Sequence, residues 1–93
     1  SDVSLVEGVI PGRVAAIGIE DELLSTQKVA VVAESKSTDS NERKLLRRLI
    51  VERVHSLYDI TPASVRIVEP GWIVKTTSGK ISREGNKQKL LRS

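Results

Sequence analysis

Residues 13–34, RVAAIGIEDELLSTQKVAVVAE, contain two short apolar runs separated by a segment that begins with Glu20-Asp21-Glu22. The runs, residues 13–19 and 28–34, are short, rich in small and β-branched side chains, and bounded by turn or polar residues, which favours buried strands. The stretch between them is too long for a tight hairpin but suits neighbouring strands. We therefore predict two strands of one small sheet.

A polar, Ser/Thr-rich segment, residues 35–40, connects the second predicted strand to an amphipathic helix. Asp39 and Glu42 have the spacing of a helix-capping box, with Asp in the place of Ser or Thr, so the helix is expected to begin there. It is expected to run to about Tyr58. Spacings of three and four residues place five apolar side chains on one stripe. These are Leu46, Leu49, Ile50, Val54 and Leu57.

Four further segments complete the pattern. Thr61-Pro62 suits the first turn of a very short helix. Residues 65–69, VRIVE, alternate between apolar and polar side chains and predict a third strand. A polar loop, KTTSGK (75–80), then precedes a predicted helix over residues 82–92. This order predicts an α+β domain, with a small sheet of about three strands flanked by helices and a mobile lysine hairpin loop near the C-terminus.

Length and composition limit the classes of protein and site. A chain of 93 residues has room for one small domain. It has no cysteine and a single histidine, His55, so disulfides, thiolate metal sites and histidine-based zinc sites are not expected. No apolar run approaches the length of a membrane-spanning helix, and no signal segment opens the chain, so we expect no membrane span and a cytoplasmic location.

Charge is distributed unevenly along the chain. Residues 75–93 carry six basic residues and one acidic residue, Glu84, for a net charge of +5 within an overall +3. A basic tail suggests a partner that bears phosphate, such as a nucleotide or nucleic acid, or an acidic protein surface. A solvated helix face with many Lys and Arg side chains explains the same charge, so both interpretations stay open on charge alone.

The loop TTSGK offers the residues that phosphate recognition requires. Thr76, Thr77 and Ser78 supply hydroxyls, Gly79 allows a positive φ, and Lys80 can deliver an ammonium group to a phosphate or carboxylate. A Walker A loop is excluded by its flanks. That motif needs Gly where the chain has Val74, and Ser or Thr where it has Ile81.

The stretch WIVKTTSGKISR resembles the last core motif, commonly PKTxSGKIxR, of the acyl-CoA synthetase, fatty-acyl-AMP ligase and luciferase superfamily of adenylate-forming enzymes. Val74 replaces the usual Pro. The segment 13–34 is similar to the family's strand–turn–strand segment, so the resemblance covers residues 6 to 91. Seven residues match the motif: Lys75, Thr76, Ser78, Gly79, Lys80, Ile81 and Arg83.

The resemblance implies a two-step reaction in a longer enzyme. A carboxylic acid, with a fatty acid as one candidate, and ATP with Mg²⁺ give an acyl-adenylate, and the acyl group then passes to coenzyme A or to the phosphopantetheine of a carrier protein. A large N-terminal adenylation domain binds most of these groups. Residues 1–93 are expected to be the single C-terminal lid domain, inactive when isolated. The acid, the thiol acceptor and the oligomeric state are not specified.

The resemblance also assigns residue roles. Lys80 is the expected catalytic lysine, whose charge acts during adenylation, and the lid is expected to rotate for the thioester-forming step. The expected substrate and nucleotide loop comprises Lys75, Thr76, Thr77, Ser78, Gly79 and Arg83. Trp72 is expected to anchor the core rather than stack on adenine. The alternative is a small basic binding module for nucleic acid or an acidic protein, but the chain lacks aromatic residues for base stacking, so nucleic acid is not the expected partner.

Overall fold

The computed structural model describes residues 8–21 and 26–92 and contains three strands and two helices in the order β-β-α-β-α. The elements are β1 (Val14–Asp21), β2 (Thr26–Glu34), α1 (Ser40–Tyr58), β3 (Ser64–Val68) and α2 (Arg83–Arg92). The predicted α+β class is confirmed. Residues 22–25, which belong to the upstream segment of the resemblance, lie outside the described residues.

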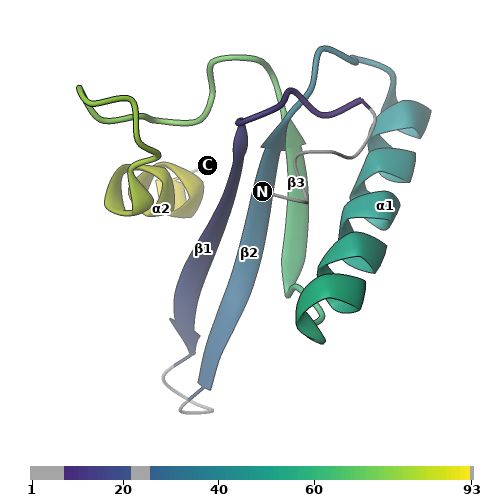
Figure 1. Ribbon diagram of the computed structural model, residues 1–93, viewed down its shortest axis with the longest axis horizontal. Coiled ribbons are helices and arrows are strands. Elements are labelled where there is room, and N and C mark those ends of the chain that lie inside the picture. Colours follow the sequence, from purple (N-terminus) through teal and green to yellow (C-terminus); the bar gives the residue numbers. More distant parts are fainter. Residues whose placement is uncertain (1–7, 22–25, 93) are drawn as a thin grey trace.

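The sheet has the strand order β1-β2-β3. β1 pairs antiparallel with β2, with Ile17 opposite Ala30, and β3 pairs parallel to β2, with Ile67 opposite Ala33. The two helices lie on opposite sides of this sheet, α1 near β3 and α2 near β1 (Figure 1). β2 is therefore the central strand of a three-layer domain.

Alternating side chains of β2 divide the core into two apolar clusters. Val31 and Ala33 pack in the cluster that contains the buried face of α1, and Ala30 and Val32 pack with Trp72 in the other cluster. Since successive strand residues point to opposite faces, a central strand covered on both sides is apolar throughout. This explains why residues 29–33 lack polar side chains.

The ends of α1 follow local rules. Asp39 is the N-cap, and its Oδ2 accepts a hydrogen bond from the Glu42 backbone N–H at 3.2 Å, which confirms the predicted start. The Glu42 side chain does not return the bond to Asp39 and instead accepts one from the Ser37 hydroxyl. At the other end Asp59 adopts a left-handed conformation, with φ of 55°, and its N–H donates to the His55 carbonyl.

Replacing Asp39 with alanine should lower the free energy of unfolding by about 0.5–2 kcal/mol, the usual cost of losing a helix N-cap. The reason is that the backbone N–H of Glu42 loses its acceptor. Chemical denaturation of the chain measures the change, and Asp39→Asn, which keeps a side-chain acceptor, is the matched control. A loss from the Asn variant as large as that from the Ala variant would contradict capping as the cause.

Two local predictions are wrong. Leu57 was expected on the buried stripe of α1 but is 40% exposed, because the sheet covers the helix only as far as Val54. Thr61-Pro62 does not begin a helix. The Ala63 N–H donates to the Val29 carbonyl at 2.8 Å, so the chain is already bonded to β2 one residue before β3 begins. Neither helix of the described part is long and apolar enough to cross a membrane.

Candidate functional site

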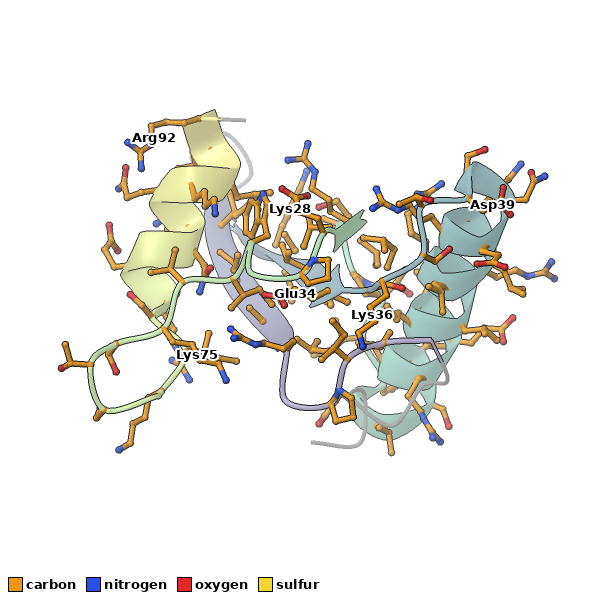
Figure 2. All side chains as sticks on the ribbon, turned by 90° about the horizontal axis from the view of Figure 1, so that it is seen from above. Lys28, Glu34, Lys36, Asp39, Lys75 and Arg92 are labelled. Atoms are coloured by element: carbon orange, nitrogen blue, oxygen red, sulfur yellow. The ribbon has the colours of Figure 1, made fainter. Side chains whose placement is uncertain are left out.

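Residues 75–81, here called the lysine loop, join the Trp72 segment to α2 and project beyond the sheet (Figures 1 and 2). One antiparallel bridge pairs Lys75 with Ile81, and the Thr76 N–H donates to the Lys80 carbonyl at 2.7 Å. Gly79 has a φ of 82°, a conformation that residues with a Cβ adopt at a cost. This single bridge does not confirm the expected lysine hairpin, so both the hairpin and its mobility stay predictions.

Hydroxyl groups of the loop bond mainly to the loop itself. The Thr76 and Ser78 hydroxyl oxygens lie 3.0 Å apart, and the Lys80 backbone N–H lies 3.3 Å from the Thr76 hydroxyl. Thr77 is exposed at the tip. Thr76 and Ser78 therefore shape the turn that carries Lys80, while Thr77 faces solvent.

The predicted cations differ in position. Lys80 is exposed, and among the side chains that the structure describes, those of residues 8–19 and 28–92, its ammonium forms no salt bridge. Lys75 lies at the base of the loop (Figure 2). Arg83 is the first residue of α2 and is also exposed. Since all three face solvent, this end of the domain can present positive charge to an anionic group on another domain or molecule.

A buried carboxylate holds the segment that leads into the loop. Glu34, the last residue of β2, is 1% exposed. Its Oε1 accepts from the Gly71 N–H and its Oε2 from the Ile73 N–H, both at 2.9 Å. Arg13 Nε lies 3.7 Å from Oε1. The central strand is thereby tied directly to the backbone just before the lysine loop.

A second buried polar side chain, Asn86, ties the loop to α2. Its amide bonds the N–H and the carbonyl of Val74, at 2.7 and 3.0 Å, and also donates to the Ser82 carbonyl at 2.6 Å. Lys89 adds a hydrogen bond of 2.6 Å to the Trp72 carbonyl, with its ammonium 4.6 Å from the centre of the Trp72 ring. Both sides of the lysine loop are therefore held by polar contacts.

Sequence reasoning found the loop but missed the residues that hold it. Glu34 closes an apolar run and was interpreted only as the end of a strand. Asn86 follows Gly85 in a polar helix and gives no periodic signal, although it is the buried residue of α2. Trp72 is 9% exposed and packs in the core, which confirms its predicted anchoring role and leaves its ring covered rather than open for base stacking.

Similarity to characterised proteins covers most of this chain but only a small part of each relative. No protein-family model matches the chain. It is 30% identical over 92 residues to the 4-hydroxyphenylalkanoate adenylyltransferase of Mycobacterium tuberculosis, which covers 92% of this chain and 14% of that protein. It is 31% identical over 78 residues to the "Probable long-chain-fatty-acid--AMP ligase FadD30" of the same species, covering 77% and 13%.

A solved relative agrees in sequence and fold. The fatty acid AMP ligase of Legionella pneumophila superposes with a TM-score of 0.71 at 28% identity over 87% of this chain and 14% of that one. The chain belongs to the acyl-CoA synthetase and fatty-acyl-AMP ligase superfamily. The same fold occurs in McyG A-PCP complexed with phenylalanyl-adenylate, with a TM-score of 0.83, 23% identity and coverage of 98% and 16%.

The share of each relative fits a C-terminal domain of this superfamily. The chain spans about one seventh of the length of the curated relatives that it matches. These relatives are adenylate-forming ligases.

Proposed function

We propose that this chain is the C-terminal lid domain of an ATP-dependent, AMP-forming acid–thiol ligase, and that Lys80 is the lysine that it contributes to adenylation. The observation that carries the proposal is the placement of the motif KTTSGKISR. It forms an exposed, projecting loop whose base is fixed by buried polar side chains. The large N-terminal domain, in this proposal, supplies the remaining site.

The lysine loop has the chemistry that adenylation requires. In that reaction a carboxylate oxygen of the acid attacks the α-phosphorus of ATP, and the bond to pyrophosphate breaks. Both reactants are anionic and repel each other. A single ammonium brought between them reduces the repulsion, holds them in line and stabilises the negative charge of the transition state. Lys80 is free of acidic partners within the described part, so its charge is available for this task.

Other residues of the loop support Lys80 rather than react. Gly79 permits the turn that precedes it, and Thr76 and Ser78 stabilise that turn. Lys75 and Arg83 add positive charge at the base of the loop or contact the large domain. Rotation of the whole lid then withdraws Lys80 and leaves room for the thiol acceptor.

The proposal also assigns Mg²⁺ and the acyl pocket to one of the two domains. Among the described residues no group of three or more His, Asp or Glu side chains lies together as a metal site would need. We propose that the large domain carries Mg²⁺, most contacts to ATP and the acid pocket. The acceptor, coenzyme A or a carrier-protein phosphopantetheine, and a cytoplasmic location are inferred with the same proposal.

The isolated chain should catalyse no acid-dependent exchange of pyrophosphate into ATP, because it carries one cation of a site that lies mainly elsewhere. Exchange is measured with the 93-residue chain, with the full-length protein that contains it, and with that protein truncated just before this domain. The full-length protein should be active and the truncated form should lose at least most of its adenylation. Turnover by the chain alone, or a truncated form with full activity, would refute the proposal.

A further inference from the structure

Asn86 is the fully buried side chain of α2, a mainly polar helix whose apolar side chains are Leu90 and Leu91. Its relative exposure is 0%, although it lies in the first turns of α2 and has no apolar atoms to gain from burial beyond one methylene. A buried amide is costly unless its hydrogen bonds are made. Asn86 makes three of them, and all go to residues that flank the lysine loop. The buried amide of Asn86 therefore serves to bond the two residues that flank the lysine loop.

The three bonds close the loop at its base. Val74 precedes the loop and Ser82 follows it, and the Asn86 amide contacts the backbone of both. Toward Val74 the amide presents one acceptor and one donor, as a neighbouring strand would. The Ser82 N–H also donates to the Val74 carbonyl at 3.0 Å. Between these contacts at the base and Lys80, the loop is held by the Lys75–Ile81 bridge and by the turn around Gly79.

Gly85 makes the close approach of α2 possible. A Cβ at this position would lie 2.9 Å from the Ser82 hydroxyl oxygen and 3.1 Å from a Val74 methyl carbon. These distances are shorter than ordinary contacts, so a side chain at this position would force the Ser82 hydroxyl, the Val74 methyl or the first turn of α2 to shift. Gly85 thus lets α2 pack closely against Val74 and Ser82, and Asn86 forms hydrogen bonds to the same two residues.

We propose that Asn86 is a positioning residue for Lys80, one that fixes the spacing of the two ends of the lysine loop and hence the direction in which Lys80 projects. The proposal rests on the proposed function of Lys80. It assigns no contact between Asn86 and substrate. A displacement of about 1 Å in a reacting group can slow a reaction about 100-fold. We therefore expect the hydrogen bonds of Asn86 to affect the rate of adenylation.

Asn86→Asp is the informative variant, because it keeps the shape and the acceptor for the Val74 N–H but replaces the donor by an oxygen. That oxygen would face the carbonyls of Val74 and Ser82, which repel it. The variant is made in the full-length protein that contains this domain. Asn41→Asp, the same change at an exposed position of α1, is the matched control.

Two readouts separate positioning from folding. We expect Asn86→Asp to slow pyrophosphate exchange about 10- to 100-fold, mainly in kcat, and to leave acyl transfer from supplied acyl-adenylate unchanged. Amide hydrogen exchange in peptides covering residues 75–82 should accelerate, while peptides from α1 keep their protection. Asn41→Asp should change none of these. If Asn86→Asp unfolds the domain, Asn86→Ala is compared in the same way.

A double variant tests whether Asn86 acts through Lys80. In a Lys80→Ala background, Asn86→Asp should cause no further loss of adenylation. Independent, multiplying losses would overturn the proposal, as would unchanged kinetics and exchange in a folded Asn86 variant. If Lys80→Ala itself leaves adenylation intact, the proposed function of Lys80 fails, whereas the hydrogen exchange of residues 75–82 still decides whether Asn86 sets the loop.

Discussion

Replacing Lys80 with alanine should slow adenylation by about 100- to 1000-fold, the usual effect of removing one preorganised donor to a developing negative charge. The reason is that the lysine loop presents this ammonium without an acidic partner in the described part of the chain. Its charge acts only while carboxylate and α-phosphate are brought together. Transfer of the acyl group from a supplied acyl-adenylate should therefore keep its rate.

The two half-reactions are measured separately in the full-length protein, by pyrophosphate exchange and by acyl transfer to the thiol acceptor. Lys44→Ala removes another exposed cation, from α1, which lies on the side of the sheet opposite α2 (Figure 1), and serves as the control. Lys80→Arg keeps the positive charge but replaces the compact ammonium by a planar guanidinium. Its adenylation rate should therefore lie between those of the original protein and the alanine variant. Equal losses in both half-reactions would contradict the role of Lys80.

Replacing Glu34 with alanine should lower the free energy of unfolding of the chain by about 2–5 kcal/mol, since a buried polar group left without its partner costs about 1–3 kcal/mol. Two backbone donors, the N–H groups of Gly71 and Ile73, lose their acceptor together. Arg13 also loses its carboxylate partner. The free energy of unfolding of a domain of this size is small, so this loss can amount to a large part of it.

Chemical denaturation measures the change in the free energy of unfolding, and two further variants are compared with Glu34→Ala. Glu34→Gln keeps one carbonyl oxygen and should lose less than the alanine variant. Glu52→Ala removes a carboxylate that is 63% exposed and pairs with Arg48 at 3.6 Å, so its cost should stay below about 1 kcal/mol. A Glu34→Ala chain as stable as the Glu52→Ala chain would show that water replaces the lost acceptor.

Hydrophobic patterning was enough to predict most of the fold. The two apolar runs of residues 13–34 form β1 and β2, and the Asp39 cap and the stripe through Val54 form α1. These signals are local, because each depends on the spacing of a few neighbouring residues. Leu57 has the right spacing but lies beyond the sheet, and the sequence does not say where the sheet ends.

The candidate site could be predicted only in part for the same reason. The motif located the lysine loop, and its glycine predicted a turn with positive φ, which Gly79 adopts. Glu34 bonds residues 37 and 39 positions further along the chain, so its role depends on tertiary structure. Asn86 and Lys89 act through polar contacts to the backbone of Val74 and Trp72, and the spacing of apolar residues does not indicate such contacts.

The stacking of Lys89 on Trp72 gives the domain a built-in optical probe. Trp72 is the single tryptophan of the chain, buried beside the segment that enters the lysine loop, with a cation 4.6 Å from its ring centre. Indole emission responds to nearby charge and to solvent. Intrinsic fluorescence of this chain therefore reports, without a label, whether α2 remains seated against residues 72–74.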